Sequence, residues 1–169
     1  MFSKDVTIEG EILAKDWKVN MSKDVKLNTL LAQAGVKTDE TTGALTTPLH
    51  FSTTYQHPEF GQSTGYDYTR TKNPTRVSLE ETLAAIESAN YALATSSGMS
   101  AIVLAFSAFP VGSKVLAVRD LYGGSFRWFA QAEAEGRFAF TYANTEEELL
   151  NNLTEDIDIV YIETPTNPL

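Results

Sequence analysis

The chain has 169 residues, 43% of them hydrophobic, which is enough for one compact core, and its formal net charge of -9 argues against a nucleic-acid-binding surface. It contains no cysteine, which excludes disulfides and thiolate chemistry within these residues. Its longest apolar run, residues 101–111, is too short to span a bilayer, and residues 1–10 lack the apolar segment of a secretory signal. We therefore expect a cytoplasmic protein that binds neither nucleic acid nor a membrane.

The N-terminal part of the chain lacks a sustained hydrophobic period. Residues 1–26 are polar and charged, and we expect a loose extension or a misassigned start, because Met21 would also serve as an initiator. Residues 26–35 predict a short helix. Residues 36–73, rich in Thr, Gly, Pro and Tyr, predict a long irregular arm, and loops of that length usually have a function or lie against a partner subunit.

Both histidines of the chain, His50 and His57, fall in this arm without a neighbouring cluster of carboxylates or cysteines, so no metal site is predicted. The arm closes with residues 66–70, in which alternation places Tyr68 and Arg70 on one side of an extended segment. Arg70 could then bind a phosphate through two hydrogen bonds. The alternative is an edge strand with a solvated charge.

Helices and strands alternate from Asn73 onward. Asn73 before Pro74 is typical of a helix start, and Thr145 with Glu148 is typical of a capping box. The expected helices cover residues 74–89, 99–108, 123–135 and 146–153, and the expected strands cover residues 91–94, 115–118, 138–142 and 157–162. Because the strands read as near-continuous apolar runs, the pattern predicts an α/β fold with a mainly parallel sheet covered on both faces.

The helical period also predicts which side chains face the core. In the helix at residues 74–89, Leu79 and Leu83 are expected on the buried face and Glu80 in solvent. In the helix at residues 123–135, Phe126 and Phe129 are both expected on the buried face.

The turn Thr95-Ser96-Ser97-Gly98-Met99 lies between the first expected strand and the helix that follows it. The first amides of a helix have no partner within the helix, and the helix dipole adds partial positive charge there, so this turn predicts an anion site. Gly98 would let the backbone approach a phosphate closely. The alternative is an ordinary helix start, because the spacing matches neither a P-loop nor a dinucleotide-binding fingerprint.

Two further loops follow strands of the same predicted sheet and are expected beyond the carboxyl ends of those strands, where ligands bind in such folds. Residues 120–124 carry Tyr122 before two glycines, and its ring could stack on a flat ligand. The alternative interpretation of Tyr122 is that its ring only packs at the rim of the site. Residues 163–168 carry Asn167. The alternative interpretation of Asn167 is that it is only a turn residue before proline.

Four ordered motifs carry these candidates: residues 66–76 (YDYTRTKNPTR), 96–102 (SSGMSAI), 121–126 (LYGGSF) and 163–169 (ETPTNPL). Together they resemble the Cys/Met-metabolism family of pyridoxal-phosphate enzymes, which carry out trans-sulfuration. The resemblance runs from about Leu27 to Leu169, and residues such as 47–55 (TPLHFSTTY) make it most similar to the N-terminal part of the cystathionine γ-synthases. It implies pyridoxal 5'-phosphate (PLP) as the cofactor and an amino acid as the substrate.

The resemblance implies a role for each matched residue. Ser97, Gly98 and Met99 match the phosphate-binding turn, with the amides of Gly98 and Met99 facing the cofactor phosphate. Tyr122 matches the tyrosine that stacks on the pyridine ring and takes part in proton transfer. Asn167 matches the asparagine near the ring hydroxyl.

Tyr68 and Arg70 match a pair that reaches into the neighbouring subunit and binds the cofactor phosphate there, so the resemblance implies dimers paired into tetramers. It also implies a domain plan. Residues 1–26 would be the extension, residues 27–75 an arm for subunit contact, and residues 76–169 the first part of a PLP-binding large domain of fold type I. That domain has three layers around a mainly parallel sheet.

The implied activity is γ-replacement, in which the thiol of cysteine replaces the acyl group of an O-acylhomoserine. Cystathionine β-lyase, γ-lyase and O-acylhomoserine sulfhydrylase are alternatives within the family. A phosphate-binding module without catalysis and a fragment that associates with an intact homologue are alternatives outside it. None of the eight lysines matches the family's Schiff-base lysine, so we expect a fragment whose 169 residues alone have no turnover.

Overall fold

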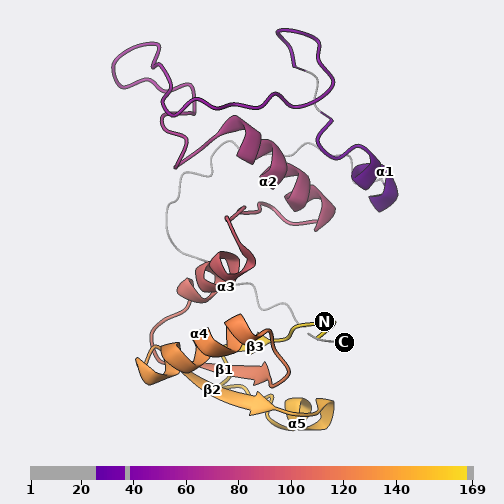
Figure 1. Cartoon of the computed structure of the whole chain (residues 1–169), viewed down its shortest axis with the longest axis vertical. Helices are drawn as coiled ribbons and strands as arrows, with labels where there is room; N and C mark the ends of the chain where they lie inside the picture. Colours follow the sequence, from indigo (N-terminus) through magenta and orange to yellow (C-terminus); the bar gives the residue numbers. More distant parts are fainter. Residues whose placement is uncertain (1–25, 37–38, 167–169) are drawn as a thin grey trace. The chain divides into compact units, whose positions relative to one another are not determined.

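The computed structural model describes residues 26–36 and 39–166, which fall into two compact units. One unit holds the described residues up to Ala94, and the other holds the described residues from Thr95 onward (Figure 1). No helix within the described ranges is long and apolar enough to cross a membrane. The two units are described one at a time.

A three-stranded parallel sheet forms the centre of the second unit. Strand β1 (Ser113–Val118) lies in the middle, with β2 (Phe138–Ala143) on one side and β3 (Ile159–Tyr161) on the other. In the register of the first pair, Val115 is level with Phe140. The predicted α/β fold with a parallel sheet is therefore confirmed, although β3 is shorter than its apolar run.

Three helices accompany this sheet. Helix α3 (Gly98–Ser107) precedes β1, α4 (Gly123–Ala134) connects β1 to β2, and α5 (Glu146–Asn151) lies between β2 and β3. Parallel strands need such crossovers, because each new strand must start again at the amino end of the sheet. In Figure 1, α3 and α4 both begin on the side of the sheet toward which the β1 arrow points. This common starting side brings two of the predicted site loops to one edge.

An aromatic cluster joins the sheet to α3 and α4. Phe129 of α4 is fully buried, and its ring centroid lies 4.6 Å from that of Phe140, 5.0 Å from that of Tyr161 and 5.2 Å from that of Phe106. Aromatic rings at these separations attract one another beyond the area that they bury. The cluster therefore sets how α3 and α4 lie on the sheet.

The buried face of α4 differs from the predicted one. Ser125, Phe129 and Ala132 are buried, whereas Phe126 is 40% exposed. Ser125 is the polar residue at this face, and its hydroxyl has a hydrogen-bond partner because Oγ donates to Glu163 Oε1 at 2.7 Å. Apolar periodicity could not count Ser125 as a core position, since its hydrogen-bond partner lies 38 residues away in the sequence.

The first unit consists of α1 (Leu27–Ala32), α2 (Pro74–Ile86) and the segment between them. Asn73 caps α2 as predicted, because its side chain accepts hydrogen bonds from the Thr75 and Arg76 amides. The described residues between the two helices contain no helix or extended strand, and they pair through isolated bridges. The segment is therefore irregular, as its composition predicts.

Residues 91–94 do not form the predicted strand. The amide of Ala94 donates a hydrogen bond to Glu80 Oε1 at 2.9 Å, and Glu80 is only 6% exposed rather than solvated. Arg76 Nε lies 3.5 Å from the same oxygen. A strand requires a neighbouring strand to pair with its backbone N–H and C=O groups. Here the side chain of Glu80, which belongs to α2, accepts the Ala94 amide instead.

Candidate functional site

Helix α3 begins at a polar turn whose hydrogen bonds fix its first amides. Ser97 is the N-cap residue: its Oγ accepts from the Ser100 amide at 3.1 Å, and its carbonyl oxygen accepts from the Ala101 amide at 3.1 Å. Thr95 Oγ1 donates to the same carbonyl oxygen at 2.8 Å. The turn thus holds the start of α3 in place without using the amides of the next two residues.

The amides of Gly98 and Met99 have no hydrogen-bond partner within the part of the chain that the structure describes. A Cβ atom added to Gly98 would meet no atom within 4 Å, so the space in front of this residue is open. Two unpaired amides at the positive end of a helix dipole suit an anion. This donor set fits a phosphate group, and binding of one stays a prediction.

The start of α4 lies at the same edge as the start of α3. Helix α3 leads into β1 and α4 leaves it, so both helices begin beyond the carboxyl end of that strand (Figure 1). In parallel sheets, this is the edge at which ligands bind. The edge predicted from the order of strands and loops therefore exists, and it carries Gly98 and Tyr122.

Tyr122 is the N-cap residue of α4, and 48% of it is exposed. Its ring lies against Gly124: a Cβ atom on Gly124 would be 2.3 Å from Tyr122 Cε1 and 3.0 Å from Cδ1. Any other residue at this position would collide with the ring in its present orientation. A half-exposed aromatic ring that is supported in this way can stack on a flat ligand.

Glu163 follows β3 and reaches the start of α4. Its Oε2 accepts from the Tyr122 amide at 2.7 Å, and its Oε1 accepts from Ser125 Oγ at 2.7 Å and from the Tyr161 hydroxyl at 2.8 Å. Burial acts to raise the pKa of Glu163, but these three hydrogen bonds outweigh it, so the pKa is lowered from its ordinary value. The side chain is therefore a carboxylate at neutral pH.

Sequence reasoning did not assign a role to Glu163. Two signals could have found it: the residue directly follows an apolar strand, and the helix that starts at the same edge has Tyr122 rather than Ser, Thr, Asp or Asn at its N-cap. A helix start without a side-chain cap indicates that another residue satisfies its amides.

Asn167 lies outside the described residues, so its predicted position near the ligand stays a prediction. The loop that leads to it is described as far as Thr166. Thr166 Oγ1 is buried and has no hydrogen-bond partner there.

Tyr68 and Arg70 belong to the other unit, where they lie together. The Arg70 guanidinium lies over the Tyr68 ring, 4.9 Å from its centroid, and the Arg70 side chain has no carboxylate partner among the described residues. Tyr68 pairs with Thr54 in an antiparallel bridge, and the Thr69 amide donates to the Thr53 carbonyl at 2.9 Å. This pairing folds the arm back on itself and leaves an exposed arginine suited to an anion.

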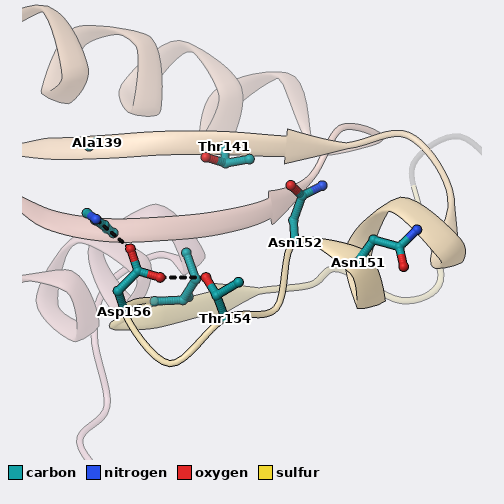
Figure 2. Close-up of a pocket in the computed structure, with 8 residues that line it drawn as sticks. Ala139, Thr141, Asn151, Asn152, Thr154 and Asp156 are labelled. Atoms are coloured by element: carbon teal, nitrogen blue, oxygen red, sulfur yellow. Dashed lines mark hydrogen bonds and ion pairs between the residues drawn. The ribbon is translucent and has the colours of Figure 1, made fainter.

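A separate pocket of about 320 Å³ lies alongside β1 and β2 on the sheet face opposite to Phe129 (Figure 2). Lys114 Nζ is 2.5 Å from Asp156 Oδ2 in its wall, and Thr154 Oγ1 donates to Asp156 Oδ1. Its remaining lining residues are Ala139, Thr141, Asn151, Asn152 and Ile157. Because Lys114 is held here, its amine lies away from the carboxyl edge that carries Gly98 and Tyr122.

The ion pair in this pocket leads to a prediction about pH. The hydrogen bonds from Lys114 and Thr154 lower the pKa of Asp156 from 3.8 to about 2. Since the folded-state pKa lies below the ordinary one, the pair stabilises the folded chain above about pH 4, and this contribution is lost as the pH falls toward 2. We expect Lys114→Met to move the Asp156 titration, followed by 13C NMR of the carboxyl group, back toward 3.8. An unchanged midpoint in that variant would contradict the assignment.

Comparison with known proteins identifies the family that this chain matches. The model of the family described as "Cys/Met metabolism PLP-dependent enzyme" matches residues 28–169. The cystathionine γ-synthase/O-acetylhomoserine (thiol)-lyase of Bacillus subtilis is 42% identical over 151 residues, which are 88% of this chain and 40% of that protein. The cystathionine γ-lyase of the same organism is 39% identical over 147 residues, which are 86% of this chain and 39% of that protein.

Solved structures agree with these matches. The cystathionine γ-synthase of Xanthomonas oryzae pv. oryzae, in complex with cystathionine, superposes with a TM-score of 0.79 at 37% sequence identity and covers 86% of this chain and 38% of its own. The chain thus spans about 40% of the length of the curated relatives that it matches. Relatives named as synthases and as lyases match over the same region at similar identity.

Proposed function

Because the chain belongs to the Cys/Met-metabolism family of PLP-dependent enzymes, we propose that it supplies the phosphate-binding and ring-stacking part of a PLP site in a trans-sulfuration enzyme. One observation carries this proposal. The amides of Gly98 and Met99, which have no hydrogen-bond partner among residues 26–36 and 39–166, lie at the same edge of the sheet as the half-exposed ring of Tyr122. When bound, PLP serves as an electron sink for carbanions formed on an amino-acid substrate.

Each residue at this edge has a distinct task in the proposal. The amides of Gly98 and Met99 hold the phosphate, and Ser97 keeps the turn in the geometry that points them outward. Tyr122 supports one side of the pyridine ring, and its hydroxyl moves a proton to or from the substrate. Asn167 contacts the ring hydroxyl.

The arm has a task in the neighbouring subunit. We propose that residues 27–75 contact a second copy of the protein, as the first part of a dimer that pairs into a tetramer. Tyr68 and Arg70 then bind the cofactor phosphate of that copy. The exposed guanidinium of Arg70 supports this assignment, because it has no carboxylate partner among the described residues and is therefore available to an anion. Residues 76–169 form the first part of the PLP-binding domain.

The reaction that we propose is γ-replacement on an O-acylhomoserine by cysteine, in the cytoplasm. Two relatives named as cystathionine γ-synthases, from Bacillus subtilis and Haemophilus influenzae, are 42% identical, compared with 39% for two γ-lyases and 36% for a β-lyase. Product analysis tests this choice in a protein that joins these residues to a segment with the Schiff-base lysine. Cystathionine formed from the two substrates supports the synthase, and breakdown of cystathionine supports a lyase.

Binding of PLP by the chain itself tests the site. We expect the amide NMR signals of Gly98 and Met99 to shift on addition of PLP or inorganic phosphate, and not on addition of pyridoxal, which lacks the phosphate. In Gly98→Val, the added side chain fits the open space but fills the position of the phosphate. Loss of two charge-assisted hydrogen bonds should weaken binding at least about tenfold.

The control is Ala105→Val, which places the same valine side chain at an exposed position of the same helix. Valine is a poorer helix former than alanine but a better one than glycine, so this control destabilises α3 at least as much as Gly98→Val does and leaves the first turn unchanged. Equal affinities in the two variants, or shifts on addition of pyridoxal alone, would remove Gly98 from the proposed phosphate site.

A further inference from the structure

Glu163 connects two elements, β3 and α4, at the edge that carries Tyr122. Its carboxylate accepts hydrogen bonds from the Tyr161 hydroxyl in β3, from the Tyr122 amide before α4, and from the Ser125 hydroxyl in the first turn of α4. Ser125 is fully buried, so its hydroxyl cannot turn to water for another partner. The carboxylate therefore fixes the start of α4 to the end of β3.

This contact supports a helix start that has no side-chain cap. The N-cap residue of α4, Tyr122, makes no side-chain hydrogen bond to the helix, unlike Asn73, Ser97 and Thr145 at the starts of α2, α3 and α5. The Glu163 carboxylate accepts the amide of the N-cap residue itself and adds a negative charge at the positive end of the helix dipole. The backbone position of Tyr122 thus depends on Glu163.

The direction of the Tyr122 ring depends on a second residue. Cε1, Cδ1 and Cζ of the ring would all lie within 3.1 Å of a Cβ atom on Gly124, so the ring rests directly on the glycine backbone. The neighbouring Gly123 does not have this property, since a Cβ atom there would meet only Arg127 Nη1, at 3.4 Å. The two adjacent glycines are therefore not equivalent.

We propose that Glu163 and Gly124 are positioning residues for Tyr122: Glu163 holds its backbone at the carboxyl edge of the sheet, and Gly124 provides the surface on which its ring rests. The role of the ring toward PLP rests on the proposed function. The geometry of the ring does not, because it follows from contacts within the chain.

The test compares Gly124→Ala with Gly123→Ala in the 169-residue chain. Alanine is the better helix former at both positions, so both variants should keep α4. Nuclear Overhauser contacts between the Tyr122 ring and residue 124 are expected in the wild-type chain and in Gly123→Ala, and they should be lost in Gly124→Ala. Affinity for PLP should fall about three- to tenfold in Gly124→Ala, whereas affinity for inorganic phosphate should stay unchanged.

A second pair of variants tests the carboxylate. Glu163→Ala removes both acceptor oxygens, so the Tyr122 amide should exchange with solvent at least about tenfold faster and the ring contacts should weaken. Glu148→Ala is the matched control, because Glu148 also accepts a backbone amide at a helix start, from Asn144 at 2.7 Å, but at α5. It should leave Tyr122 unchanged.

The outcomes separate this inference from the proposed function. Unchanged ring contacts in Gly124→Ala, or an unchanged Tyr122 amide in Glu163→Ala, overturn the positioning roles whether or not PLP binds. Absence of both phosphate and PLP binding in the wild-type chain overturns the proposed function, while loss of the ring contacts in Gly124→Ala would still support the positioning roles.

Discussion

Phe129→Ala is expected to lower the free energy of unfolding of the sheet-containing unit by about 3–5 kcal/mol. Phe129 is fully buried, and its ring packs on those of Phe106, Phe140 and Tyr161, which come from α3, β2 and β3. Truncation removes the contacts that hold these elements together and leaves a cavity that they cannot close. If the free energy of unfolding of the unit is smaller than this decrease, the variant will be unfolded and will show no cooperative transition.

Urea unfolding followed by the fluorescence of Trp128 measures the effect, because Trp128 lies 5.1 Å from Phe106 and 5.6 Å from Phe129 between ring centroids. A background variant with Trp17→Phe leaves Trp128 as the only tryptophan. Phe126→Ala is the control, since it removes the same side chain from a position of α4 that is 40% exposed. A loss in Phe126→Ala as large as in Phe129→Ala would show that the buried face of α4 is assigned incorrectly.

Asn73→Ala is expected to release the arm from the start of α2. The Asn73 Oδ1 caps the helix by accepting from the Thr75 amide at 2.9 Å, and its Nδ2 donates to the His50 carbonyl at 3.0 Å and to Thr69 Oγ1 at 2.6 Å. Loss of the cap and of two hydrogen bonds should cost about 2–3 kcal/mol locally. Hydrogen exchange at the Thr75 and His50 amides should then become roughly 30- to 150-fold faster.

Asn73→Asp separates the two halves of this contact. Aspartate keeps an oxygen for the helix cap but has no amide to donate to His50 and Thr69. The Thr75 amide should therefore stay protected, while the His50 amide, which donates to Thr75 Oγ1 at 2.8 Å, becomes faster as the arm loosens. Equal acceleration at both amides would show that the arm and the cap form a single cooperative unit.

Helix starts could be predicted from the sequence because a cap involves residues that are close in the chain. The N-cap at Asn73 is confirmed, and Thr145 Oγ1 accepts from the Glu148 amide as the capping box requires. The other half of that box differs: the Glu148 carboxylate accepts from the amide of Asn144, one residue before Thr145. Local chemistry thus predicts where a helix begins to within about one residue.

Core faces were harder to predict, because burial depends on what packs against a helix. Leu79 and Leu83 have the helical period of a core face, yet they are 51% and 38% exposed in the structure, whereas Glu80 is buried. Glu80 is stable there because it accepts the Ala94 amide and lies beside Arg76. The periodicity of a single helix contains no information about such distant partners.

The sequence by itself determined the alternation of helices and parallel strands, and therefore the edge at which Gly98 and Tyr122 both lie. These features follow from apolar runs, caps and crossovers, which act over short distances along the chain. The tertiary structure alone decided that Glu163 binds the Tyr122 amide at the start of α4 and that the ring of Tyr122 rests on Gly124 rather than Gly123. Both depend on the packing that brings the end of β3 to the start of α4 and on a ring orientation set by contacts at the ångström level, which residue types and spacings do not specify.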